Sequence, residues 1–327
     1  MNIENQIINY IKANQEASVN QLQEQIKVSR QMLHRVISKM LEEGYLQKLG
    51  RAPKVFYRLN QETVSNKSIA HSLTDGEVNF LNEHFLIITV LGKRLEGMEA
   101  MQAWCERQKL PVEKTAREFI VTKKKYLSYF LSNGLINGME KLNNTKAFDS
   151  IVIDDMFYCD FYAIERFGKT RLGTLLHFAK QGQNRQLMQE IISLTKNKII
   201  DLIKARKIEA VGYIPPTIKR HLQIMTVLQK GYNLSLPHLN LVKISGVIPV
   251  PQKALNKIED RISNARASII IKDTRQFGNV LLIDDAIGSG ATIIETANKL
   301  KQKGTARKIF GIAVTGSFKG FDVIQEV

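Results

Sequence analysis

The stretch NVLLIDDAIGSGATIIETANKL, residues 279–300, decides the fold of the carboxy-terminal half of the chain. It opens with an apolar run, residues 280–283, that has no polar face, as a central strand of a parallel sheet requires. Two aspartates follow the run, then Gly-Ser-Gly-Ala-Thr, and then the spacing of a helix that we expect from about Thr292. We therefore predict a buried strand that ends in paired carboxylates and is joined to a helix by a glycine-rich loop.

The composition of this loop favours an anion as its ligand. Its two glycines let backbone amides converge, the helix points its positive end at them, and the serine and threonine add hydroxyl donors. The neighbouring carboxylates, Asp284 and Asp285, would repel a bare phosphate, but they can accept hydrogen bonds from the hydroxyls of a ribose. The pattern predicts a sugar 5-phosphate, with its phosphate in the loop and its 2- and 3-hydroxyls on the aspartates. The predicted phosphate-binding residues are Ala286, Ile287, Gly288, Ser289, Gly290, Ala291 and Thr292.

Residues 150–327 alternate strand-like apolar runs with segments of helical spacing. This order is typical of a parallel α/β sheet, in which ligands bind beyond the carboxyl ends of the strands. The predicted fold class of this half is therefore α/β with a parallel sheet. The expected strands are residues 150–155, 209–216, 280–285 and 308–316, and the expected helices are residues 172–181, 190–207 and 292–304.

A resemblance to a known family rests on VLLIDDAIGSGAT, residues 280–292. This stretch is similar to the PRPP-binding signature of type I phosphoribosyltransferases, in which apolar residues and two acids precede a loop rich in Thr, Ser and Gly. Gly288 departs from the signature, because Thr or Ser is usual there, and the departure removes a hydroxyl contact to PRPP. The resemblance implies a type I phosphoribosyltransferase fold, with PRPP as ligand or substrate.

Further stretches resemble the ComF competence-protein branch of that family, namely residues 166–180, 211–234 and 249–273. They carry, in order, a KxxLG element, a strand-end proline loop, and the pattern Gln252, Leu255, Arg261 and Asn264. That branch usually begins with a cysteine-rich zinc ribbon. Here the ribbon is missing, and the only cysteines, Cys105 and Cys159, cannot supply a four-cysteine zinc site.

The resemblance also implies where the rest of PRPP would lie. The diphosphate would lie on the loop at residues 212–220, residues 245–265 would form a mobile hood, and Mg²⁺ would bridge PRPP and solvent rather than occupy a protein cage. In an active enzyme, Asp284 and Asp285 would be catalytic, and the site would stabilise an oxocarbenium-like C1 while diphosphate leaves. A plain Pro-Pro turn that caps the strand is the alternative for the first loop. The predicted diphosphate-loop residues are Pro215, Pro216, Thr217, Lys219 and Arg220, and the predicted hood cations are Lys253 and Arg261.

The first 60 residues predict a different module. Helical spacing indicates three helices, of which the second begins with a capping box, Ser18 and Gln21, and the third begins at Ser29 with an apolar stripe that includes Met32. Two alternating runs, residues 45–49 and 54–59, then indicate a hairpin. Three helices and a hairpin resemble a winged helix, in which the third helix enters the DNA major groove and the wing contacts phosphates. The predicted DNA contacts are Arg30, Gln31, His34, Arg35 and Lys39 on the helix, and Lys48, Arg51 and Lys54 on the hairpin.

The charge of the chain agrees with a polyanionic partner. Lys and Arg number 47 against 31 Asp and Glu, for a formal net charge of +16, and neutralising phosphates would release counterions. A merely basic surface, or a winged helix that binds protein, is the alternative. The start of the chain has no apolar export core and the run at residues 85–91 is too short to span a bilayer, so we expect a cytoplasmic protein without a membrane partner.

Between these parts, residues 61–149 read as a polar linker and a largely helical region that is broken near Pro111. Within it, the charge run at residues 123–125 is interpreted as a solvated face. We predict a winged-helix domain at residues 1–60, a coupling or dimerisation region at residues 61–149, and a phosphoribosyltransferase-like domain at residues 150–327.

Two functions fit this layout. It resembles that of purine-operon repressors, which implies a homodimeric DNA-binding regulator that senses PRPP or a nucleotide. The alternative is an active phosphoribosyltransferase, or an effector that modifies nucleotides or nucleic acid, for example in a bacterial defence system, positioned by its winged helix. The hood has no recognisable nucleobase motif, so the acceptor base stays open.

Overall fold

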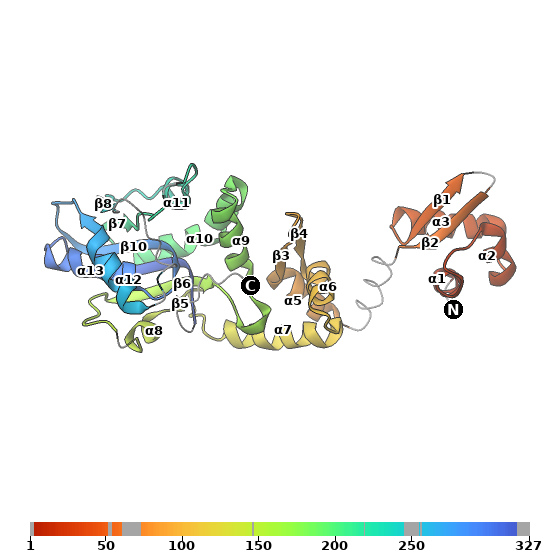
Figure 1. The fold of residues 1–327 in the computed structure, drawn as a ribbon, viewed down its shortest axis with the longest axis horizontal. Helices are drawn as coiled ribbons and strands as arrows, with labels where there is room; N and C mark the ends of the chain where they lie inside the picture. The colour runs from red at the N-terminus through yellow and green to blue at the C-terminus, as the bar shows by residue number, and fades with distance from the viewer. Residues whose placement is uncertain are drawn as a thin grey trace. The chain divides into compact units, whose positions relative to one another are not determined.

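The structure, a computed structural model, describes residues 3–51, 54–60, 73–145, 147–218, 220–244, 255 and 257–318. The chain divides into two units (Figure 1). The first comprises Met1–Glu83 and Gly97–Arg117, and the second comprises His84–Glu96 and Glu118–Val327. The region predicted to join two domains, residues 61–149, therefore contributes to both units.

The first unit begins with the predicted winged helix. Ser18 and Gln21 form the expected capping box, with the Ser18 amide donating to Gln21 Oε1 at 2.8 Å, and the Met32 amide donates to Ser29 Oγ at 3.2 Å. Because the apolar positions recur at helical spacing, the three helices bury a common core that includes Ile7, Leu33 and the hairpin. The elements are α1 (Ile3–Asn14), α2 (Val19–Ile26), α3 (Arg30–Glu42), β1 (Leu46–Arg51) and β2 (Lys54–Leu59), the two strands pairing antiparallel.

One residue of the predicted apolar stripe lies elsewhere. Met32 is 42% exposed, whereas Leu33, Ile37 and Met40 are buried. Met32 sits in the first turn of α3, one position before the buried series, so its side chain points away from the core. The expectation that it belongs to the stripe was wrong.

The predicted helical region after residue 70 contains a hairpin that the sequence did not indicate. Helices α5 (Asp75–His84), α6 (Gly97–Gln108) and α7 (Val112–Leu127) are present, with Pro111 between the last two. Between α5 and α6, however, β3 (Leu86–Ile88) and β4 (Arg94–Glu96) pair antiparallel. Gly92 permits the turn through its positive φ of 79°, and its amide donates to Thr89 O at 2.9 Å.

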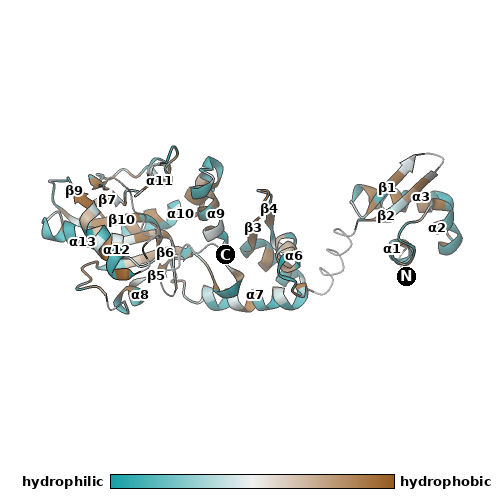
Figure 2. Cartoon of the chain, in the orientation of Figure 1, coloured by the Kyte–Doolittle hydropathy of each residue, from teal (hydrophilic) through white to brown (hydrophobic). Residues whose placement is uncertain are grey.

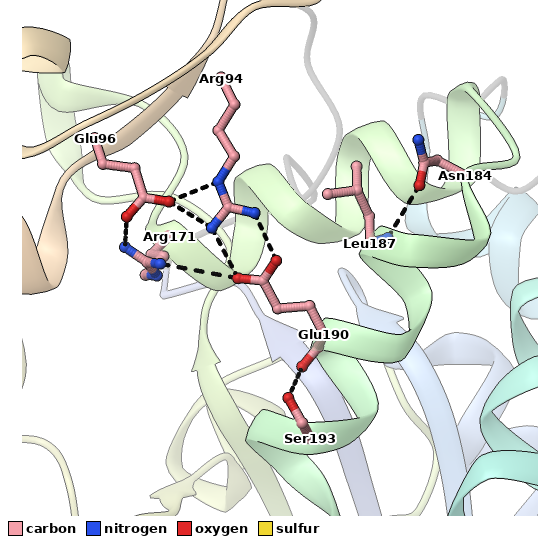
Figure 3. A network of polar contacts seen from close by, with 7 residues as sticks. All are labelled: Arg94, Glu96, Arg171, Asn184, Leu187, Glu190 and Ser193. Atoms are coloured by element: carbon pink, nitrogen blue, oxygen red, sulfur yellow. Dashed lines mark hydrogen bonds and ion pairs between the residues drawn. The ribbon is translucent and has the colours of Figure 1, made fainter.

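An ionic network attaches this hairpin to two helices of the second unit, α9 (Arg171–Gln181) and α10 (Arg185–Ala205) (Figure 3). Arg94 donates from Nη1 to Glu190 Oε2 at 2.6 Å and from Nε to Glu96 Oε1 at 2.6 Å. Arg171 completes the network with a bond of 3.0 Å to Glu96 Oε2. These bonds raise the pKa of Arg94, with Glu190 the main cause, so the guanidinium keeps its charge.

A mostly parallel sheet forms the centre of the second unit. Its order is β5-β6-β11-β10-β7, in which only β5 runs antiparallel to its neighbour. The carboxyl ends of the four parallel strands therefore share one edge, which we call the carboxyl edge. The strands are β5 (Ile136–Asn137), β6 (Asp155–Phe161), β7 (Ala210–Tyr213), β10 (Phe277–Ile287) and β11 (Ala306–Gly316).

Helices cover both faces of this sheet. Leu281 and Ile283 of β10 share a buried cluster with α9, α10 and α11 (Ile224–Tyr232). On the opposite face, Gly311 of β11 approaches Ile293 of α13 (Ala291–Gln302) so closely that an added Cβ would lie 3.0 Å from it. In Figure 2, hydrophilic residues are prominent on α13, whereas β9 (Ile269–Ile271) is hydrophobic. Burial on both faces explains the unbroken apolar runs of the strands.

Two strand predictions were displaced. The strand expected at residues 150–155 begins only at Asp155. Just before it, the Ile309 amide of β11 donates to the side chain of Asp154, at Oδ2 and 2.8 Å. The strand expected to end at the paired aspartates, residues 280–285, begins at Phe277 and continues to Ile287, so Asp284 and Asp285 lie within β10. The pairing of Ile287 with Gly316 of β11 extends β10 to Ile287.

No helix among the described residues is both long and apolar enough to cross a membrane.

Candidate functional site

The exposed face of α3 is the candidate nucleic-acid interface. Its predicted contacts Arg30, Gln31, His34 and Arg35 are all exposed. They recur at the spacing that puts side chains on one helix face, and none of them bonds to another side chain in the described part of the chain. The face can therefore meet a partner without first breaking internal bonds.

The remaining predicted contacts of the winged helix differ in their surroundings. Lys39 donates to Glu4 Oε1 at 2.9 Å and lies 3.8 Å from Glu43, so DNA would have to compete with two carboxylates for it. Lys48 on β1 is exposed. The side chains of Arg51 and Lys54 lie outside the described part of the structure.

The carboxyl edge of the sheet in the second unit brings two of the predicted loops together. Strands β7 and β10 are parallel neighbours, with Ile283 paired to Tyr213. The loop after β7 and the loop after β10 therefore begin side by side, and the Ile214 amide donates to Ile283 O at 2.9 Å. The rule that parallel strands end at one edge places both loops at that edge, and the pairing of β7 with β10 makes them neighbours.

The two carboxylates are held differently. Asp285 Oδ1 accepts a hydrogen bond of 2.8 Å from Lys180 Nζ on α9. Asp284 accepts only from the Asp285 amide, at 2.8 Å, among the bonds formed by described residues. Burial and the adjacent charge of Asp285 raise the pKa of Asp284, against the opposing effects of Lys180 and Lys243. One carboxylate is thus neutralised by a lysine, and the other is poised to take up a proton.

The glycine loop closes tightly onto α13. Gly290 has a φ of 83°, and a Cβ there would lie 2.5 Å from Leu142 Cδ2, so the position is restricted to glycine. Ser289 is buried, and its Oγ accepts from the Ala291 amide at 3.3 Å. The first amides of α13 have no acceptor within the helix, and they point toward the loop. The loop therefore has the donors that an anion needs.

The sequence analysis did not predict several cations that lie at this edge. Lys141, on α8 (Met139–Asn143), donates to Gly288 O and to Ser317 Oγ. Burial, together with the positive charge of Arg261, lowers its pKa to about 8. Burial likewise lowers the pKa of Lys243 on β8 (Leu241–Lys243), against the effect of Asp284. No local pattern marks these lysines, because α8, α9 and β8 are distant in sequence from the loop.

The diphosphate-loop and hood predictions are described in part. Pro215, Pro216 and Thr217 follow β7, and Arg220 donates to the backbone oxygen of Lys180, the lysine that neutralises Asp285. Arg261 lies on α12 (Ile258–Ser268) and donates from Nε to Leu255 O at 2.7 Å. Lys219 and Lys253 lie outside the described residues, as does most of the predicted hood before α12.

A metal ion held by protein side chains has no ready site in the described part of the chain. The described ranges contain no group of three or more His, Cys, Asp or Glu side chains placed to hold a metal ion. The donors at the carboxyl edge are instead cations and amides around an acid pair. A Mg²⁺ held through the ligand stays a prediction.

Comparison with known proteins identifies one part of the chain. Residues 2–47 match the family model described as winged helix-turn-helix DNA-binding. A comparison with curated proteins found no match. The chain thus has an amino-terminal winged helix-turn-helix DNA-binding domain, followed by an α/β unit with a five-stranded, mostly parallel sheet.

Proposed function

We propose that the carboxyl edge of the sheet binds a phosphorylated ribose, either PRPP or a nucleotide, and that the protein is a DNA-binding regulator responsive to that ligand. One observation carries the proposal. The acid pair and the glycine loop of β10 begin beside the loop of β7, with Lys141, Lys180 and Lys243 around them.

The chemistry of the ligand follows from the mixture of charges. Phosphate groups need the amides of the loop and the cations, whereas Asp284 and Asp285 need partners that donate hydrogen bonds. A ribose phosphate offers both kinds of group in one molecule. An unphosphorylated sugar or a bare phosphate would leave half of the site without partners.

The regulatory part of the proposal rests on linkage. A ligand changes DNA affinity only if it binds the DNA-competent and DNA-incompetent states with different affinity. We propose that the protein is a homodimer, because winged helices in dimers read half-sites about one helical turn apart.

A second function, transfer of the phosphoribosyl group, is favoured by the raised pKa of Asp284. A carboxyl group that titrates nearer to neutral pH suits general acid–base catalysis. In that case the acid pair would stabilise positive charge at C1 of the ribose as diphosphate departs, largely by electrostatics.

Calorimetry with PRPP, with and without Mg²⁺, tests the ligand assignment. The double variant Asp284→Asn with Asp285→Asn replaces both carboxyl acceptors of the ribose hydroxyls, so affinity should fall on the order of a hundredfold, or about 3 kcal/mol. Unchanged affinity in a folded double variant would falsify the assignment.

Release of diphosphate separates the two functions. Incubating the wild-type protein and PRPP with the four common bases or with DNA should release no diphosphate if the protein is a sensor. Turnover that the double variant abolishes would establish the transferase instead.

A further inference from the structure

The side chain of Lys141 lies where the glycine loop and the last strand of the sheet meet. Its ammonium group donates to Gly288 O, one residue after β10, and to Ser317 Oγ, one residue after β11. Ser317 also bonds back to the loop, since its amide donates to Ile287 O at 3.1 Å. Two strand ends therefore fix the position of one cation beside the predicted phosphate.

This cation has no counter-charge among the residues that the structure describes. Among the described residues no carboxylate lies within ion-pair distance of Lys141, and its charged neighbour is Arg261, another cation. By contrast, Lys180 is paired with Asp285, and the buried Lys123 lies 3.6 Å from Asp160. A partly buried ammonium group that has only neutral acceptors carries an uncompensated desolvation cost, which a bound anion would remove.

We propose that Lys141 is the counter-ion of the ligand phosphate, exchanging the Gly288 carbonyl for a phosphate oxygen when the ligand binds. The assignment rests on the proposed function, and it adds a residue that lies outside the stretch resembling phosphoribosyltransferases. A bond from an ammonium group to an anionic oxygen is about twice as strong as one to a neutral carbonyl, so the exchange favours binding.

The composition of the loop leaves room for a donor from elsewhere in the chain. Gly288 has no side chain, so it offers a phosphate no side-chain donor. Lys141 reaches the same position from α8 and supplies a donor that also carries charge. The site should consequently prefer a phosphorylated sugar over its unphosphorylated form more strongly than the loop amides alone would allow.

The variant Lys141→Gln tests the charge of Lys141 separately from its hydrogen bond to the loop at Gly288. Glutamine keeps an N–H donor for Gly288 but loses the positive charge. In calorimetry with ribose 5-phosphate and with PRPP, its affinity should fall at least about tenfold, while Lys141→Arg should retain affinity within a few-fold. The matched control is Lys196→Gln. Lys196 lies on α10 and also donates to a backbone carbonyl, Gly231 O, at 3.1 Å. This variant should bind as the wild type does.

A measurement on the wild-type protein covers the case in which Lys141→Gln does not fold. Acetylation at pH 8, followed by peptide mass spectrometry, should show that ribose 5-phosphate protects Lys141 and leaves Lys196 unchanged, whereas ribose protects neither. If wild-type protein binds neither phosphorylated ligand, the proposed function itself is wrong. If it binds them and Lys141→Gln binds equally well, or Lys141 labels equally with and without ligand, the role of Lys141 is overturned and the proposed function survives.

Discussion

The acid pair of β10 shows how neighbouring residues of one type acquire different properties. Asp285 has Lys180 at 2.8 Å, and Asp284 has no lysine at hydrogen-bond distance among the described residues. The sequence alone indicated two equivalent carboxylates. Their difference comes from α9, which begins more than a hundred residues before the pair. No local sequence pattern could therefore predict this difference.

Replacing Asp284 should stabilise the protein without ligand. Its pKa is raised on folding, so the folded state holds this proton more tightly than the unfolded state, and stability falls as pH rises above the ordinary carboxyl value of about 4. Asp284→Asn removes this cost. Thermal unfolding at pH 7–8 should occur at a higher temperature, by roughly 2–4 °C for each kcal/mol gained.

The pH profile and a neighbouring variant are the controls for that result. The difference between Asp284→Asn and wild type should shrink toward pH 4 and below, where both side chains are neutral. Asp285→Asn should instead lower the unfolding temperature, since it leaves Lys180 without its partner. Stabilisation by Asp284→Asn that is equal at acidic and neutral pH would rule out titration as its cause.

Among the elements, α3 is the one whose function the sequence anticipated best. Its cap at Ser29, its polar face and, apart from Met32, its buried series appear as expected, because each is determined within a few residues. Its exposed arginines should dominate contact with phosphate or bases.

Replacing Arg30 and Arg35 with Ala should weaken binding to duplex DNA and reduce its salt dependence by up to about two phosphate equivalents. Fluorescence titration at several salt concentrations measures both effects. Lys12→Ala is the control, because Lys12 is exposed on α1 and its replacement removes a charge from another helix of the domain. Absence of wild-type binding at low salt would identify the winged helix as a protein-contact module.

Both apolar contacts and ion pairs hold the β3–β4 hairpin, because Leu86 and Leu95 are buried and Leu86 belongs to the core cluster of the second unit. Arg94 contacts both Glu96 and Glu190, and its side chain is 35% exposed. Arg94→Met should lower stability by only about 1 kcal/mol, because partly exposed ion pairs contribute little. Hydrogen exchange should nevertheless accelerate at residues 86–96.

A surface arginine in the first unit provides the comparison. Arg117 pairs with Glu77 at 3.1 Å and Glu113 at 2.7 Å and is 48% exposed. Arg117→Met should leave exchange in the hairpin unchanged. Equal exchange in Arg94→Met and wild type would mean that backbone pairing and the buried Leu86 and Leu95 hold the hairpin without this ion pair.

Sequence patterns predicted elements well where the signal was local, and less well where burial or contact was distant. The strand and helix around the glycine loop, both capping serines and the hairpin of the wing were predicted. The β3–β4 hairpin was missed because strands of three residues carry almost no periodicity. The charge run at residues 123–125 was expected to be solvated, but Lys123 is buried 3.6 Å from Asp160 of β6, while the other two lysines are exposed.

At the scale of the whole molecule, the proposed regulator requires that ligand and DNA affect each other. We expect a homodimer whose DNA affinity changes severalfold with saturating PRPP and Mg²⁺, and whose PRPP affinity changes by the same factor with DNA. DNA titrations with and without ligand, alongside light scattering, measure this. A monomer with identical titration curves would favour the effector function over the regulator.

The division of the chain has a practical consequence for anyone who wishes to dissect it. The polypeptide passes from one unit to the other after Glu83, after Glu96 and after Arg117. A single protease cut at any of these points therefore releases neither unit, and a fragment that starts at residue 118 lacks the β3–β4 hairpin together with the partners of Arg171 and Glu190 on it. Separate expression of the α/β unit calls for residues 84–96 to be rejoined to residue 118 through a short designed linker, in place of a simple truncation.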